Sequence, residues 1–258
     1  MKMIESRLFR TPTPLELDRF ERALSQVSYQ RQFNGIGTRG EKTLHAVLKA
    51  MIDEDSTHHE QKIGPFVADV FDGERITEIQ TRQFNTMRSK LDAFLPVVPV
   101  TIVYPMASRK WLVWLDPLTG EATKRRLSPK KPHPIQVVDE LYKISAFLDH
   151  PHLSITIVFL ELEEQRWLSG WSEDKKKGSR RHERIPIQLE GFISLRKPED
   201  YLSLLPEDLP ESFTSAMVAK YAKISVRTAQ TALRLLERLH QIVSVGKDGR
   251  HKKFTRIG

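Results

Sequence analysis

The sequence predicts an α/β (α+β) fold, in which helices flank a mixed sheet and a smaller C-terminal unit follows. Short β-rich runs alternate with segments whose apolar residues recur at helical spacing. The dipeptide Asp72-Gly73 separates two of these runs and suits a hairpin turn, because it readily adopts positive φ angles. After Pro198 the composition changes to a proline-punctuated acidic stretch. We therefore expect two domains, residues 1–200 and residues 201–258.

Bulk composition narrows the class of protein and its partners. The 258 residues allow a substantial core and include no cysteine, so we expect a reducing cytoplasm and neither disulfides nor thiolate metal sites. No apolar run approaches the roughly 18 residues of a membrane helix, and the charged N-terminus lacks a signal peptide, so we expect no membrane partner. The net charge of +8 favours a polyanion such as DNA, although positive charge can also serve solubility alone.

Two helices are expected before the first strands of the sheet. Residues 12–28 open with the helix-start pair Thr13-Pro14 and carry an apolar face, which indicates a packing helix. After a glycine-containing loop, residues 41–52 read as a second amphipathic helix with Glu41 in its first turn. Glu41 could simply be a favourable negative charge at the positive end of that helix.

An antiparallel meander should follow, with strands at residues 59–63, 66–71 and 75–81. The turn leaves two registers open, in which Phe71 pairs with either Glu74 or Ile76. Because side chains alternate along a strand, Asp69 shares a face with Glu78 in both registers. Cross-strand neighbours lie within roughly 5 to 8 Å of one another. The hairpin therefore brings two carboxylates together.

This carboxylate pair is the candidate functional site, and Gln80 lies on the same face. One interpretation is that these residues simply form the solvated face of the hairpin. Against it, Val67 and Phe71 are apolar and share that face with Asp69. Two close carboxylates beside apolar residues either shift their pKa values or recruit a cation. Oxygen ligands of this kind suit Mg²⁺, which takes one or two protein carboxylates together with water and phosphate oxygens.

Asp69, the turn and the following Glu78-Ile79-Gln80 resemble the core motif of the PD-(D/E)xK nuclease superfamily, with Gln80 where lysine is commonest. The resemblance covers about residues 35–105, and the helix and strand after the hairpin follow in the order that this superfamily uses. It implies a restriction-endonuclease-like mixed sheet flanked by helices, and phosphodiester hydrolysis with Mg²⁺ or Mn²⁺.

The resemblance also implies a role for each residue of the motif. Asp69 and Glu78 would hold the metal, assisted by the Ile79 carbonyl and by Glu41 from the upstream helix. Gln80 could orient the attacking water but cannot take its proton, since an amide has no accessible pKa.

Some members of this superfamily take their active-site lysine from the helix after the hairpin, which here spans residues 83–95. Lys90 flanks the apolar stripe of this helix and could replace the lysine missing at position 80, although an ordinary solvated lysine is the alternative that helix position alone favours. Arg82 and Arg88 would lie near the same rim and could contact phosphates.

The rest of the first domain adds strands and basic segments. Apolar, β-rich runs predict further strands at residues 97–104, 111–115 and 153–162. Residues 134–148 should form a helix, and residues 121–131 a basic loop or edge hairpin. Residues 172–184 are dense in positive charge, which is typical of a solvated loop and also of a basic arm that contacts a DNA backbone.

The C-terminal residues predict two helices joined by a tight turn and followed by a basic hairpin. The helices span residues 214–222 and 225–240, with Ser225 as a good N-cap of the second. The hairpin pairs residues 242–245 with residues 252–257. This order of elements resembles the winged helix-turn-helix family.

The second resemblance implies a set of DNA-binding residues. On the outward face of the recognition helix these are Arg227, Thr228, Gln230, Thr231 and Arg234. In the wing, where they would touch phosphate or the minor groove, they are Lys247, Arg250, Lys252 and Lys253. The alternative is a winged-helix module used for protein contacts.

Together the two resemblances imply a metal-dependent DNA endonuclease directed by a C-terminal winged-helix domain. A homodimer could then make paired cuts. A different class of function fits the same residues, namely a non-catalytic DNA-binding regulator that uses a nuclease-like scaffold. A nuclease acting on RNA or on branched DNA is a third interpretation.

Overall fold

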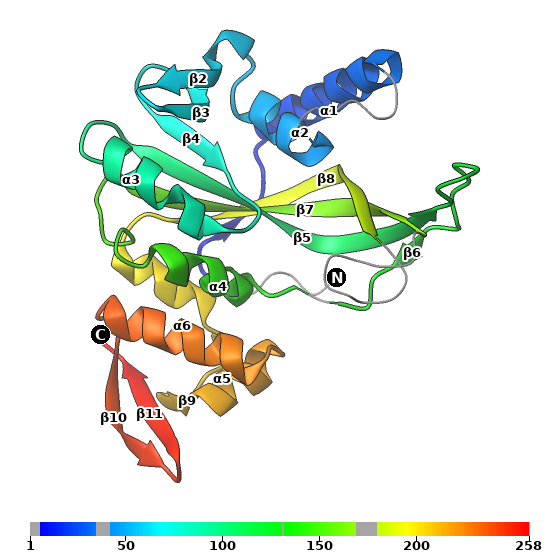
Figure 1. Ribbon diagram of the computed structural model, residues 1–258. Coiled ribbons are helices and arrows are strands. Elements are labelled where there is room, and N and C mark those ends of the chain that lie inside the picture. Colours follow the sequence, from blue (N-terminus) through cyan, green and yellow to red (C-terminus); the bar gives the residue numbers. More distant parts are fainter. Residues whose placement is uncertain (1–5, 35–41, 131, 169–179, 258) are drawn as a thin grey trace.

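A mixed sheet runs through the centre of the protein, and the described residues contribute eight strands to it (Figure 1). The computed structural model describes residues 6–34, 42–130, 132–168 and 180–257. The strand order is β1-β8-β7-β5-β4-β3-β2, with β6 paired to β5 outside this path. Neighbours β4, β5 and β7 are parallel, and the other pairs are antiparallel. The strands are β1 (Phe9–Arg10), β2 (His59–Ile63), β3 (Phe66–Phe71), β4 (Ile76–Ile79), β5 (Val100–Leu115), β6 (Arg126–Leu127), β7 (Leu153–Trp167) and β8 (Arg180–Leu195).

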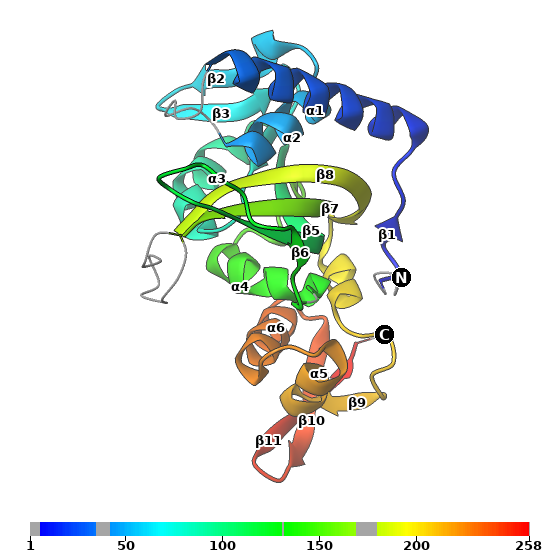
Figure 2. The same ribbon diagram turned by 90° about the vertical axis from the view of Figure 1, so that its right-hand side faces the viewer.

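Helices cover both faces of this sheet and close a hydrophobic core on each (Figure 2). Side chains alternate along the central strands, so Ile102 and Ile157 pack toward α3 and α4, whereas Val103 and Val158 pack toward α1 and α2. The helices are α1 (Pro14–Asn34), α2 (Thr43–Ile52), η1 (Ser56–His58), η2 (Phe84–Met87), α3 (Arg88–Phe94), η3 (Pro134–Val137), α4 (Val138–Leu141) and η4 (Tyr142–Ile144). Within the described ranges, no helix combines the length and apolar character needed to cross a membrane. The predicted mixed α/β architecture with flanking helices is thus confirmed.

The predicted meander is formed by β2, β3 and β4. Phe71 pairs with Ile76, which is the register that places Asp69 opposite Glu78. Gly73 in the turn has a φ of 93°, a conformation that glycine adopts at little cost. The local turn chemistry therefore determines which residues face each other across the hairpin.

The strands beyond the hairpin are longer than predicted. Residues 100–104 and 111–115, which were expected in two separate strands (97–104 and 111–115), belong to the single strand β5, which stays paired with β7 along its length. A register shift between Ala107 and Arg109 absorbs an extra residue as a bulge, so the ladder continues. Strand β8 was not predicted, and it includes the end of the basic segment 172–184.

The segment 134–148 is divided into η3, α4 and η4 and is not the single helix expected from the sequence. It begins at Pro134 as predicted, and its apolar residues are buried. The β-branched residues Ile135, Val137 and Val138 have low helix propensity, which favours short 3₁₀ turns at its start.

The C-terminal part contains both predicted helices and the predicted hairpin. Thr214 and Ser225 cap the two helices by accepting hydrogen bonds from Met217 N and Thr228 N. A further short strand, β9, adds to the hairpin by pairing with β11. The elements are η5 (Pro198–Leu204), β9 (Ser212–Thr214), α5 (Ser215–Ala222), α6 (Val226–Arg238), β10 (Ile242–Asp248) and β11 (His251–Arg256).

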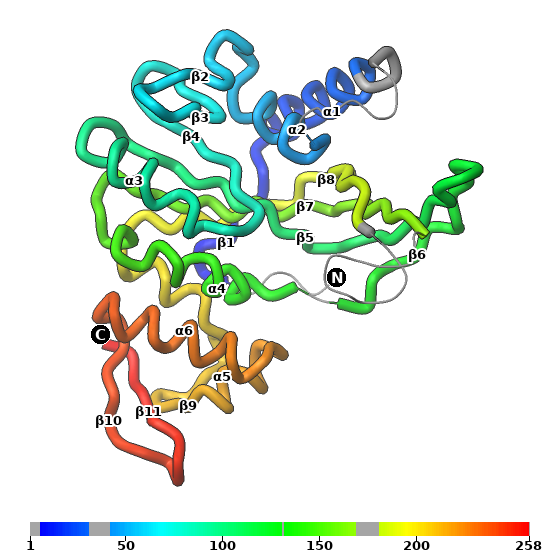
Figure 3. The backbone as a smooth tube through the Cα atoms, in the orientation of Figure 1, coloured from blue at the N-terminus to red at the C-terminus, as the bar shows by residue number. Residues whose placement is uncertain are grey.

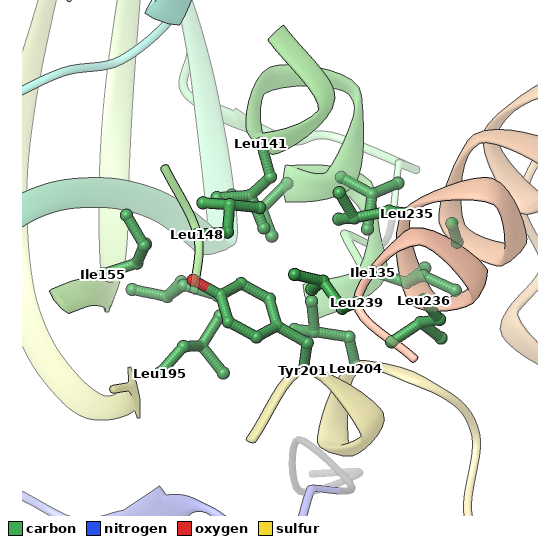
Figure 4. Close-up of a cluster of buried hydrophobic side chains, with 14 of the residues drawn as sticks. Ile135, Leu141, Leu148, Ile155, Leu195, Tyr201, Leu204, Leu235, Leu236 and Leu239 are labelled. Carbon is green, nitrogen blue, oxygen red and sulfur yellow. The ribbon is translucent and has the colours of Figure 1, made fainter. Parts of the chain in front are cut away.

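The C-terminal part shares a continuous hydrophobic core with the sheet, and α6 lies directly against α4 (Figure 3). Tyr201, at the expected domain boundary, is only 1% exposed. Its ring lies between the sheet residues Ile155 and Leu195 and the helix residue Leu239 (Figure 4). The stretch expected as an acidic linker is itself packed through its leucines, namely Leu204, Leu205 and Leu209.

Replacing Tyr201 by alanine should destabilise both parts of the chain together, because its ring fills the shared core. We expect a loss of about 3 to 5 kcal/mol in the free energy of unfolding, measured by urea denaturation. Tyr142→Ala is the matched control, since Tyr142 is 43% exposed and should change stability by only about 0.5 kcal/mol. Equal small losses in both variants would contradict a shared core.

Candidate active site

Asp69 lies in the fork where β3 and β4 separate. The backbone ladder between these strands ends at the pair of Val70 and Thr77. Beyond it, the Asp69 side chain replaces a ladder partner, because its Oδ2 accepts a hydrogen bond of 2.7 Å from Ile79 N. The same oxygen lies 3.1 Å from Nε2 of His45 on α2. Two strands and one helix therefore position this carboxylate.

Glu78 is held inside the protein by Lys90. Its side chain is only 1% exposed, and Lys90 Nζ donates hydrogen bonds of 2.8 Å to each of its carboxylate oxygens. Lys90 comes from α3, which is anchored in the core, and it also donates to the Val67 carbonyl at 2.6 Å. The structure thus places Lys90 beside Glu78, while its replacement of the lysine missing at position 80 stays a prediction.

The two carboxylates have pKa values that are shifted in opposite directions. Burial, followed by the negative charge of Asp69, raises the pKa of Glu78 to about 7, against the opposing hydrogen bond and charge of Lys90. Burial alone would raise the pKa of Asp69, but the hydrogen bond and charge of His45, with the Ile79 amide, hold it below its ordinary value. Carboxylate pairs with separated pKa values are typical of sites that do acid–base or metal chemistry.

The other predicted residues of the site have different positions. Gln80 donates from Nε2 to Met87 Sδ at 3.3 Å and, like Arg82, lines the cavity in front of Asp69. Arg88 is directed elsewhere, because its Nε donates to a carbonyl oxygen on η4 at 2.7 Å. The structure therefore does not bring Arg88 to this rim, and Glu41 lies outside the described residues.

A cavity of about 460 Å³ lies beside Asp69, between the start of α2, the end of β4 and the start of β8. Besides His45 and His182, its lining contains four cationic side chains, Lys42, Arg82, Arg181 and Arg184, and three carboxylates, Glu60, Asp69 and Glu183. The cations exceed the carboxylates by one, which leaves a small positive charge in a concave site. The cavity can therefore take an anionic ligand close to the Asp69 carboxylate.

Sequence analysis missed three of these residues. His45 is a single histidine on an amphipathic helix, and nothing in the sequence links it to Asp69. Arg181 and Arg184 belong to the basic segment that was interpreted as a loop or arm. The strand-like run after residue 184, I-P-I-Q-L-E-G-F-I-S-L, was the available signal that these arginines begin a strand.

The oxygen donors at this site fit a hard divalent cation. Asp69 presents a carboxylate to the cavity, which has room for water and phosphate oxygens, the ligand set of Mg²⁺. Glu78 does not line the cavity, and both of its oxygens are bonded to Lys90. Across the described ranges, no three His, Cys, Asp or Glu side chains are grouped as a metal site. The described part of the protein would thus contribute few ligands, as is usual for Mg²⁺ bound together with a phosphate.

The predicted DNA-binding residues of α6 divide into two groups. Three of them form an exposed stripe, namely Arg227, Gln230 and Arg234. Thr228 donates to Asp139 on α4 at 3.2 Å, and the half-buried Thr231 donates to the Arg227 carbonyl at 3.1 Å. Thr228 is therefore directed toward α4, whereas Thr231 bonds within its own helix.

In the hairpin of β10 and β11, three of the predicted lysines and arginines are exposed and Lys253 is half-buried. Lys247 lies directly opposite Lys252, and like charges in that arrangement are unfavourable. Lys252 forms a 3.5 Å ion pair with Glu237. The tip of the hairpin therefore presents concentrated positive charge.

The fold and the site define a mixed α/β protein with a buried acid–lysine pair beside a basic cavity. The chain belongs to the family described as "Domain of unknown function (DUF8091)", whose model matches residues 42–196. It is similar to a protein of Treponema pallidum (strain Nichols), described as "Uncharacterized protein", with 28% identity over 229 residues that cover 86% of this chain and 87% of that protein. No solved structure matches the chain.

Glu78→Gln should remove a pH dependence of stability. The folded-state pKa of about 7 lies above the ordinary value of roughly 4.3, so the protonated form is favoured by folding. The wild type therefore loses free energy of unfolding as pH rises between these values, and Glu78→Gln lacks this loss. Urea denaturation over a pH series measures it, with the exposed Glu74→Gln as control. Parallel pH curves for wild type and Glu78→Gln would contradict the assignment.

Proposed function

We propose that this protein is a cytoplasmic, metal-dependent DNA endonuclease of the PD-(D/E)xK type, with Mg²⁺ or Mn²⁺ as cofactor. The observation that carries this proposal is the position of Asp69, which lies at the wall of a cavity with four cationic side chains and near enough to Glu78 for its charge to raise the pKa of that residue. A polyanionic backbone is the ligand that such a cavity favours. Phosphodiester hydrolysis would take place beside Asp69, whose carboxylate at the wall of the cavity would bind the cation.

The chain's own residues have separate tasks in this proposal. Asp69 and Glu78 would hold the cation, which when bound polarises the scissile phosphate and lowers the pKa of a water. His45 orients Asp69 through its hydrogen bond. Lys90 favours the ionised form of Glu78. Gln80 could orient the attacking water, and its proton would pass to another base or to solvent.

The C-terminal part would act as a winged helix that directs the nuclease to DNA. The exposed stripe of α6 carries Arg and Gln, which are able to bind base edges in a major groove. The hairpin carries facing lysines suited to phosphate contacts. Its shared core with the sheet would hold the DNA at a set position relative to the cavity.

Cleavage of supercoiled plasmid in Mg²⁺ or Mn²⁺ tests this function. Asp69→Asn and Glu78→Gln should each lower the rate by more than about 100-fold, since even outer-shell changes at metal sites cost roughly 10- to 100-fold. Glu74→Gln, at the exposed turn of the same hairpin, should cleave like the wild type. Cleavage that survives both site substitutions would reject the assignment.

A non-catalytic DNA-binding regulator is the second candidate. The observation in its favour is that both oxygens of Glu78 bond to Lys90 and the Gln80 amide bonds to Met87. This alternative predicts DNA binding that does not require a divalent metal and is not followed by cleavage of plasmid, linear DNA or RNA.

The wing is tested by DNA binding without cleavage, in the presence of a chelator. The double variant Lys247→Gln/Lys252→Gln should bind all sequences more weakly. Its slope of log affinity against log salt should shrink by about 0.9 for each lost phosphate contact. Lys220→Gln on the exposed face of α5 is the control. An unchanged slope in the double variant would indicate that this hairpin serves protein contacts.

A further inference from the structure

Glu164 on β7 organises a cluster of cations outside the Asp69 site. Its side chain is fully buried, yet four basic residues from β5, β7 and β8 surround it. Lys110 Nζ lies 3.4 Å from its carboxylate, Arg181 Nε 3.5 Å and Arg184 Nε 3.4 Å, and Arg166 donates hydrogen bonds to it. We name these five residues the Glu164 cluster.

The Glu164 cluster contains more positive charge than one ion pair requires. Four cations against one carboxylate leave a local charge of +3. Burial, followed by the charge of Arg184, lowers the pKa of Arg181. Burial also lowers the pKa of Lys110, although Glu164 opposes this shift. Packing like charges together is unfavourable, and an additional anion would relieve it.

A second cavity, of about 230 Å³, lies against this cluster. The basic residues in its lining are Lys110, Lys130 and Arg184, and the polar ones are Thr81, Tyr104 and Gln136. In the described chain no carboxylate lines this cavity. Each of these polar and basic side chains can donate a hydrogen bond to an anion. The buried Nε of Arg184 lies 3.4 Å from the Glu164 carboxylate but forms no hydrogen bond within the described residues.

The second cavity adjoins the cavity at Asp69. Thr81 and Arg184 line both of them, so the two cavities meet at these side chains. Arg181 lines the Asp69 cavity, and Lys110 lines the second. The Glu164 cluster therefore contributes cations to both cavities, along the halves of β5, β7 and β8 that extend beyond the rest of the sheet (Figure 1).

We propose that the second cavity and the Glu164 cluster form a phosphate-binding subsite, which holds the nucleic-acid backbone next to the phosphate bound at Asp69. The identity of the ligand as nucleic acid rests on the proposed function, whereas the anion site rests on the cluster and the cavity. Glu164 acts as a scaffold that holds the arginines in place, and Lys110 and Arg184 contact the phosphate. The backbone runs past Thr81 from one cavity to the other.

The experiment measures binding of labelled duplex DNA, single-stranded DNA and RNA to the full chain over a salt series, with a chelator present to prevent cleavage. Lys110→Gln and Arg184→Gln should each weaken binding and lower the salt slope by about 0.9. Arg109→Gln is the matched control on the same strand, because Arg109 pairs with Glu161 and Glu190 and lines neither cavity. Its slope should equal that of the wild type.

Inorganic phosphate provides a second readout that does not depend on nucleic acid. Phosphate should raise the Tm of the wild type and of Arg109→Gln, since a ligand of the folded state stabilises it, and should raise that of Lys110→Gln and Arg184→Gln less. Glu164→Gln should lower the Tm, because four cations lose their buried partner, and phosphate should restore part of that loss. If phosphate raises the Tm equally in all variants, the proposed subsite is wrong.

The two proposals can fail separately. Plasmid cleavage by the wild type, together with salt slopes of Lys110→Gln and Arg184→Gln equal to that of Arg109→Gln, would overturn the subsite and leave the nuclease standing. If Lys110→Gln and Arg184→Gln show smaller salt slopes and smaller rises in Tm with phosphate, but the wild type cleaves nothing, the subsite is supported in a protein that binds nucleic acid without cleaving it. The subsite holds the backbone of whichever ligand (duplex DNA, single-stranded DNA or RNA) shows the largest decrease in salt slope between the wild type and these two variants.

Discussion

A carboxylate buried inside a sheet needs a cation beside it, and in this protein that pair is Glu78 with Lys90. Removing either charge alone would leave its partner uncompensated, at a cost of about 3 to 5 kcal/mol. Lys90 therefore keeps α3 docked on β3 and β4, where it also bonds to the Val67 carbonyl. The packing of α3 completes the core beneath the sheet. The stability of this region and the chemistry of the candidate site thus depend on one pair.

The continuous core between the sheet and the C-terminal part has a consequence for function. Helix α6 packs both against its own hairpin and against α4, so only a narrow stripe of it faces solvent. The Thr228–Asp139 hydrogen bond joins the two parts at their surface. A ligand on that stripe would be held in a defined orientation to the basic cavity. The hairpin of β10 and β11 extends away from this body (Figure 3).

Positive charge in this chain is gathered by buried acids. Glu164 holds Lys110, Arg166, Arg181 and Arg184 close together. A second acid on β7, Glu161, pairs with arginines from β5 and the following loop. Such pairs fix the directions of long side chains that would otherwise be mobile, and this lowers the entropy lost when they bind an anion. Part of the net charge of +8 therefore lies at fixed positions beside the cavities and is not spread over the surface.

The sequence by itself determined the features that depend on neighbouring residues. The Asp72-Gly73 turn between two β-rich runs predicted the hairpin in which Phe71 pairs with Ile76, and Ser225 marked the start of α6. These follow from turn, cap and periodicity chemistry that acts over a few positions. Lys90 was singled out by the resemblance to a nuclease family and not by a local pattern.

Only the tertiary structure decided the contacts between distant residues. His45 meets Asp69 across 24 positions of sequence, and Lys110 meets Glu164 across 54. Strand β5 became continuous because β7 pairs with its whole length, and β8 brought Arg181 and Arg184 to the cavity. The same holds for the burial of Tyr201 at what was expected to be a domain boundary. Such contacts depend on strand register and core packing, which the whole chain selects together and which no short stretch of sequence encodes.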